Sequence, residues 1–233
     1  MALSDRDLLT RSAAVALAMV LLPSFASASD WPEPRVPDGM TTAAISSHLI
    51  YNGVDMRSQV FTSAQSAADI VTFYRQLWGK QSVVNQLAQW QVVGHREGNF
   101  FLTVQVRADG AGSRGDIGIT RIPTEKLHVI LGQGVPHPSN SKIVNDIAYP
   151  DDATPARTLA LVNTLSIQQN ASYYRDHLPA DGWQPLAANA CAPGAGSCVM
   201  NYAQGDRKMT LALSARQGRS EIVISMMGKG ITP

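Results

Sequence analysis

The sequence predicts an α+β protein built as a tandem duplication of one ββαβββ module. Three observations indicate this class: a repeat between residues 66–75 and 166–175, alternating apolar and polar residues after each copy, and turn dipeptides between the alternating segments. Each module would carry one helix on one face of a mostly antiparallel sheet. The two copies would lie side by side or form one extended sheet.

The chain begins with a segment typical of a cleavable signal peptide. Basic residues precede an apolar run at residues 13–22, and small residues then lead to a cleavage site after Ala28. The run is shorter than the roughly 20 apolar residues that span a bilayer. We therefore expect residues 1–28 to be removed, leaving a periplasmic or extracellular protein without a membrane span.

Each module is expected to start with a pair of strands. In the first module, the dipeptide Asn52-Gly53 is typical of a tight hairpin turn. In the second, an acidic turn at residues 150–152 takes its place. The expected strands cover residues 46–51, 56–62, 142–149 and 158–164.

A helix follows in each copy and is the clearest part of the repeat. Ser66 and Ser166 are expected N-caps, and Asp69 and Gln169 would complete capping boxes three residues later. A glycine ends the first helix and a proline ends the second. The residues at i, i+4, i+7 and i+11 form the apolar faces: Ala67, Val71, Tyr74 and Trp78, and Ile167, Ala171, Tyr174 and Leu178.

Further strands close each module. Residues 97–106 align with residues 204–213, and both segments alternate apolar with polar side chains after a Gly-Asn or Gly-Asp turn. Closing strands are expected at residues 116–120 and 221–225. Residues 80–89 fit either a loop or a short helix.

A segment rich in proline and glycine separates the two copies. It divides the mature chain into a first module at residues 29–123, a linker at residues 124–140 and a second module at residues 141–233. Residues 127–131 inside the linker could form an extra strand that crosses to the other module.

The two cysteines favour a structural disulfide. Cys191 and Cys198 flank a short segment containing glycine and proline, and disulfides persist in the compartments that exported proteins reach. The alternative is a metal or redox site. No histidine lies nearby in the sequence, and the spacing is not that of the Cys-x-x-Cys redox motif.

Three short strings match known motifs but lack their context. Residues 110–115 satisfy GxGxxG, yet strands are expected on both sides, so we expect a hairpin loop rather than a dinucleotide site. The Arg-Gly-Asp string at residues 114–116 is expected at a charged loop tip. Ser139 and Lys142 have the Ser-x-x-Lys spacing of one hydrolase class, without the helix that this class requires.

Charge and composition narrow the possible partners. A formal net charge of +1 provides no long-range field that favours nucleic acid. No two histidines have the i, i+4 spacing of a metal site on a helix. We therefore expect no cofactor, no metal and no nucleic-acid partner.

Aromatic and arginine residues at repeated positions are the candidate binding residues. A Tyr-Arg pair occupies the same helical position in both copies, and the tyrosine hydroxyl would reach a rim of the sheet. The alternative is shared packing in a duplicated fold. The first copy also has more aromatic residues than the second at the positions compared. The candidates are Tyr74, Arg75, Tyr174, Arg175, Trp78 and Phe100.

These observations predict an exported, non-enzymatic protein of the cell envelope that acts as a binding or accessory module for a protein partner. Two alternatives stay open: a periplasmic hydrolase with an unrecognised site, and a carrier of a small ligand in a cleft between the two modules. A cleft that gathers Ser139, Lys142 and a histidine would favour the hydrolase.

Overall fold

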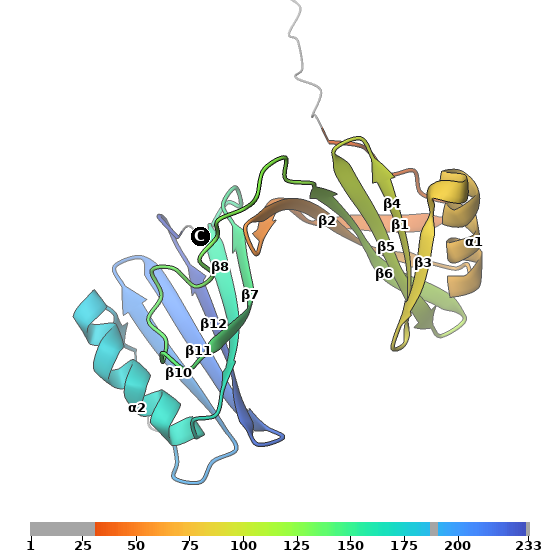
Figure 1. Cartoon of the computed structure of the whole chain (residues 1–233). Coiled ribbons are helices and arrows are strands. Elements are labelled where there is room, and N and C mark those ends of the chain that lie inside the picture. Colours follow the sequence, from red (N-terminus) through yellow and green to blue (C-terminus); the bar gives the residue numbers. More distant parts are fainter. Residues whose placement is uncertain (1–30, 187–190, 232–233) are drawn as a thin grey trace, which may run out of the picture. The chain divides into compact units, whose positions relative to one another are not determined.

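The computed structural model describes residues 31–186 and 191–231 (Figure 1). The predicted signal peptide at residues 1–28 lies outside the described residues. The strands form one 12-stranded sheet in the order β3-β4-β5-β6-β2-β1-β7-β8-β12-β11-β10-β9. Every neighbouring pair is antiparallel, which confirms the α+β class with a mostly antiparallel sheet.

The first half of the chain supplies six strands and one α-helix. Its elements are β1 (Met40–Tyr51), β2 (Val54–Ser63), α1 (Ala67–Trp78), the 3₁₀ turn η1 (Gly79–Gln81), β3 (Val83–Leu87), β4 (Trp90–Glu97), β5 (Phe100–Asp109) and β6 (Gly112–Arg121).

The second half repeats this order of elements. Its elements are β7 (Lys142–Tyr149), β8 (Ala156–Asn163), α2 (Ile167–His177), η2 (Leu178–Asp181), β9 (Gln184–Pro185), β10 (Ser197–Gln204), β11 (Arg207–Arg216) and β12 (Arg219–Met227). The strand order from β7 to β9 matches the order from β1 to β3.

Local sequence explains where the helices and hairpins lie. Both predicted capping boxes are present: the Ser66 hydroxyl accepts from the Asp69 amide, and the Ser166 hydroxyl accepts from the Gln169 amide. The first hairpin turns at Asn52 and Gly53, which both have positive φ, as a tight turn requires.

Each half buries its own core between its helix and one face of the sheet (Figure 1). On α1, the predicted Ala67, Val71 and Tyr74 are buried, together with Ile70. The core of the second half also includes Val135, from the segment between β6 and β7. The two core clusters share no residue.

Several sequence predictions were wrong. Residues 83–87 form β3 rather than a loop or helix, and with β9 this gives each half one strand more than the predicted ββαβββ. Residues 127–131 form no strand. The GxGxxG string is not a loop, because only Gly110 and Ala111 turn and Gly112 already begins β6. The Arg-Gly-Asp string therefore lies within β6 and not at a loop tip.

Gly115 shows why a glycine is needed within β6. A Cβ atom at this position would lie 1.9 Å from the backbone oxygen of Gln105 and 2.7 Å from the Phe61 ring. The glycine therefore permits close packing of β6 against β5 and Phe61.

The two halves meet where β1 pairs with β7. Only Ile50↔Ala148 and Tyr51↔Ile147 are in register, and the Asn52 side chain accepts a 2.8 Å hydrogen bond from the Asp146 amide. His48 adds a further link, because its ring contacts Asp55 at 3.1 Å and Asp151 at 2.7 Å. Burial by itself lowers the pKa of His48, but the two carboxylates outweigh it and raise that pKa above its ordinary value.

The predicted disulfide between Cys191 and Cys198 is present, with Cα atoms 5.5 Å apart. Both cysteines pack against the core of the second half. Among the described residues, no helix is both long and apolar enough to cross a membrane.

Candidate functional site

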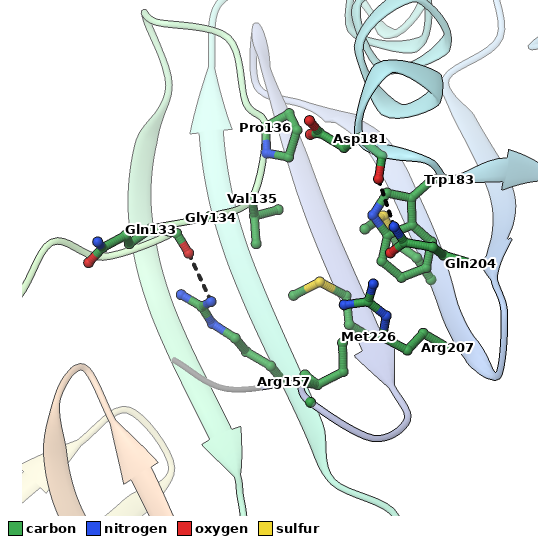
Figure 2. Close-up of a pocket in the computed structure, with 13 residues that line it drawn as sticks. Gln133, Gly134, Val135, Pro136, Arg157, Asp181, Trp183, Gln204, Arg207 and Met226 are labelled. Carbon is green, nitrogen blue, oxygen red and sulfur yellow. Dashed lines mark hydrogen bonds between the residues drawn. The ribbon is translucent and has the colours of Figure 1, made fainter.

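A hollow of about 710 Å³ in the second half is a candidate site (Figure 2). We call it the Trp183–Arg207 hollow. Its wall comes from five separate stretches of chain: the segment before β7, the start of β8, the η2–β9 connection, the facing ends of β10, β11 and β12, and the end of the described chain. Its volume lies within the roughly 300–1,000 Å³ that ligand sites commonly occupy.

The floor of the hollow is apolar. Met209 of β11 and Met226 of β12 are directly paired and 2% and 5% exposed. Val135 and Ile231 also line the hollow and belong to the same core. The floor is therefore part of the packed interior, so it holds the polar groups above it in place.

Trp183 forms the wall beside η2. Gly182 ends this 3₁₀ turn with φ 82°, and the Trp183 amide then donates a 3.0 Å hydrogen bond to the Leu178 carbonyl. The Gln204 side-chain amide donates a 2.8 Å hydrogen bond to the Asp181 carbonyl. These contacts fix the backbone that carries Trp183, and the residue packs in the core of the second half with 6% of its surface exposed.

Among the described residues, Arg207 supplies an unpaired positive charge to the hollow, which Asp181 also borders. Its guanidinium carbon lies 5.7 Å from the centroid of the Trp183 ring. Among residues 31–186 and 191–231, Arg207 has no ion-pair partner. A guanidinium held beside an indole can still donate two parallel hydrogen bonds to a carboxylate, because the donors lie at its edge.

Arg157 also borders the hollow, but its charge is already balanced. Its Nε and Nη2 atoms donate to the two carboxylate oxygens of Asp146 at 2.8 Å and 2.7 Å. Its Nη1 atom donates to the Gln133 carbonyl at 3.0 Å (Figure 2). Asp146 and Arg157 are 5% and 3% exposed. This buried pair supports the wall of the hollow.

Asp146 stays ionised because of these contacts. Burial alone raises the pKa of its carboxyl group, but the hydrogen bonds from Arg157, the amide of Gly132 and the charge of Arg157 outweigh burial. The pKa of Asp146 is therefore below its ordinary value.

The six predicted binding residues do not form one site. Tyr74 and Tyr174 are completely buried, and their hydroxyl groups do not reach the rim as predicted. Burial raises the pKa of both hydroxyls. Arg75 and Arg175 are exposed, one on each helix, and the Arg175 guanidinium donates to the Ser172 hydroxyl at 2.8 Å.

Trp78 and Phe100 are half-buried and lie in different contacts. The Trp78 ring packs 4.8 Å from Tyr74 and stacks at 5.3 Å on His95. The Phe100 ring packs 5.1 Å from Trp31. Neither ring is fully inside the core, so the first half keeps partly exposed aromatic surface.

The predicted serine–lysine pair lies outside the Trp183–Arg207 hollow. Ser139 lies in a turn after Pro138, Lys142 begins β7, and both are exposed. Neither residue borders the Trp183–Arg207 hollow. The sequence analysis missed Trp183 and Arg207 because their signal is not local: 24 positions separate them, and only the fold brings their side chains together.

The fold and the hollow define a sheet-dominant α+β protein with an open, cation-bearing hollow in its second half. Comparison with known proteins gave no match: no family model fits the sequence, and no curated protein or solved structure is significantly similar to it.

Proposed function

We propose that this chain is an exported, non-enzymatic binding module of the cell envelope, and that the Trp183–Arg207 hollow receives a carboxylate-bearing group of its partner. One observation carries the proposal: the Arg207 guanidinium lies beside the Trp183 ring in a preformed hollow and has no ion-pair partner among the described residues. Such a group binds carboxylates in the two-point geometry that favours recognition.

Export is part of this proposal. The apolar run at residues 13–22, the small residues before position 28 and the disulfide between Cys191 and Cys198 support it. Sequencing the N-terminus of protein from a periplasmic extract tests it. We expect the mature chain to start at Ser29, and a chain that keeps residues 1–28 in the cytoplasm would contradict export.

We also infer that the two halves arose by tandem duplication of one module. The shared order of elements, the two capping boxes and the buried Tyr74 and Tyr174 at equivalent helical positions support this inference. The hollow uses positions that have diverged, because Arg207 corresponds to Phe100 in the first half.

Capture of a partner from an envelope extract, with the tagged mature protein as bait, tests the proposal. Wild-type protein should recover a partner that the Arg207→Gln variant recovers at least about tenfold less, because a hydrogen-bonded charge contributes roughly 1.5–3 kcal/mol. Lys208→Gln is the matched control, since this exposed lysine is the next residue on β11 and does not border the hollow. Equal recovery by both variants would contradict the proposal.

A small-ligand carrier is the second candidate, favoured by the volume of about 710 Å³. The hollow lies in the second half and the segment before it, and not between the two modules as the sequence analysis suggested. Native mass spectrometry of protein purified from the periplasm distinguishes the candidates. A bound small molecule that the Arg207→Gln variant loses favours the carrier. Capture of a protein partner, with no small molecule bound, favours the binding module.

A further inference from the structure

Strand β3 is an edge strand without the usual protection against pairing. It is the last strand at one end of the sheet, pairs only with β4 among the described residues, and is exposed along its whole length. Val83, Val84 and Leu87 are 56%, 44% and 62% exposed. Charged residues, prolines or bulges normally protect such edges, and β3 contains no charged residue or proline.

A hollow of about 840 Å³ lies between this edge and the exposed side of α1. Thr72, Arg75 and Gln76 of α1 border it on one side, and Ser82 and Val84 on the other. Val84 is directly opposite Val93, which belongs to the core beneath α1, so the helix-facing side of β3 opens into the hollow. We call this surface the α1–β3 groove.

The groove is preformed by the connection between its two walls. Gly79 ends α1 with φ 58°, and its carbonyl accepts hydrogen bonds from the Ser82 amide at 3.1 Å and the Ser82 hydroxyl at 2.7 Å. This turn sets where β3 begins relative to α1. The edge of β3 is therefore held in place before any ligand binds.

The charged residues that border the groove are both positive. Arg75 projects from α1 and Lys80 from η1, and neither has an ion-pair partner within residues 31–186 and 191–231. The groove is therefore complementary to carboxylates.

We propose that the α1–β3 groove binds an extended acidic segment of another protein by strand addition. The segment pairs its backbone with the outer edge of β3. Side chains of a strand alternate between faces, so every second residue points into the groove, where its carboxylate meets Arg75 or Lys80. The residues between them lie on the opposite face, where apolar side chains cover Val83 and Leu87. This surface is distinct from the Trp183–Arg207 hollow.

The same charges favour an acidic partner over a second copy of this chain. Two copies paired through β3 would bring together the sequence Val-Val-Asn-Gln-Leu from both sides, which offers no carboxylate to Arg75 or Lys80. Two cations are also few for a nucleic acid, whose affinity rests on many phosphate contacts.

Selection of random twelve-residue segments displayed on phage, with the full mature protein as target, tests the proposal. We expect enriched segments to carry Asp or Glu at alternating positions between apolar residues. A synthetic peptide of the most enriched sequence should bind Arg75→Glu and Lys80→Glu at least about tenfold more weakly, since hydrogen bonds to charged groups contribute roughly 1.5–3 kcal/mol. Arg96→Glu is the matched control on the other face of β4, and it should bind as wild type does.

The mode of binding has its own readout. Hydrogen exchange of the backbone amides in residues 83–87 should slow at least about tenfold when the peptide is bound, because strand addition gives outward amides a partner. Val83→Lys places a charge on the face of β3 opposite the groove, of the kind that protects natural edges, and should weaken binding without unfolding the sheet.

Four results would overturn the proposal: no enrichment, enrichment without acidic residues, equal binding by Arg75→Glu, and unchanged exchange in β3. A dimer in solution that Val83→Lys dissociates would also overturn it, in favour of a second copy as the occupant. The Arg207→Gln variant keeps the groove intact, so failure at the hollow leaves this test unaffected.

Discussion

Asp146 and Arg157 join three segments of the second half through one buried ion pair. Asp146 lies in β7, Arg157 lies in β8, and both also bond to the chain before β7: Gly132 donates its amide to Asp146 at 2.8 Å, and Gln133 accepts from Arg157. A buried pair of this kind contributes little over apolar residues, but removing one partner leaves a charge without compensation.

Substitution of Asp146 by Asn is therefore expected to be strongly destabilising. The variant leaves the Arg157 guanidinium buried without a counter-ion, and the free energy of unfolding should fall by about 3–5 kcal/mol. Urea denaturation followed by circular dichroism measures this change. The double variant Asp146→Leu/Arg157→Met should lose less than the single one, because it buries no charge. A larger loss in the double variant would contradict the argument.

The same carboxyl group makes stability depend on pH in the acid range. Its pKa is lower in the folded protein than the ordinary value of 3.8, so its stabilising contribution is complete above that value and is lost as the pH falls through the folded pKa. The free energy of unfolding of the wild type should therefore decrease below about pH 5. Denaturation at a series of pH values should show a smaller decrease for Asp146→Asn, and identical slopes would contradict this assignment.

The buried hydroxyl of Tyr74 is expected to cost stability. It has no hydrogen-bond partner among the described residues, and such a group loses its bonds to water on folding. Tyr74→Phe should raise the free energy of unfolding by about 1 kcal/mol. Tyr173→Phe is the matched control and should lower it by about as much, because the Tyr173 hydroxyl donates to the His137 carbonyl at 2.8 Å. A destabilised Tyr74→Phe variant would contradict this argument, because it would show that the hydroxyl group stabilises the fold.

At the scale of elements, the helices begin where side chains satisfy their first amides. Ser166→Ala removes the acceptor of the Gln169 amide and should lower the free energy of unfolding by about 1 kcal/mol, whereas Ser166→Gly should cost only a few tenths. Thermal denaturation of the two variants measures the difference. Equal losses would show that the serine does not act as a cap.

Elements with local signals could be predicted from the sequence. The capping boxes, the Asn52-Gly53 turn and the alternation in β5 and β11 each depend on residues a few positions apart, and all were confirmed. Residues 83–87 gave no such signal, because β3 is exposed on both faces and has no apolar–polar alternation. Its strand conformation depends on pairing with β4.

The candidate sites were harder to predict because their residues come from segments that are far apart in the sequence. Arg75 was among the sequence candidates and borders the α1–β3 groove, but the edge strand beside it was missed. Trp183 and Arg207 come from elements that no short motif connects. Tyr74 and Tyr174, which the sequence singled out, lie in the buried core clusters of the first and second halves.

At the scale of the whole molecule, one sheet connects two separate cores. The clusters beneath α1 and α2 share no residue, and the pairing of β1 with β7 includes only two pairs of residues. Cooperativity depends on contacts that cross such a boundary, so regions with their own cores can open separately.

A cavity made in the second core tests this separation. Leu211 is completely buried in that cluster, and Leu211→Ala should cost about 2–5 kcal/mol through lost burial and the cavity left behind. Hydrogen exchange should then accelerate in β10–β12, while the amides of β4–β6 keep their wild-type rates. Val104→Ala is the reciprocal variant, because Val104 is buried in the first core and should accelerate only β4–β6. Acceleration in both halves by either variant would show that the junction couples the two cores into one cooperative unit.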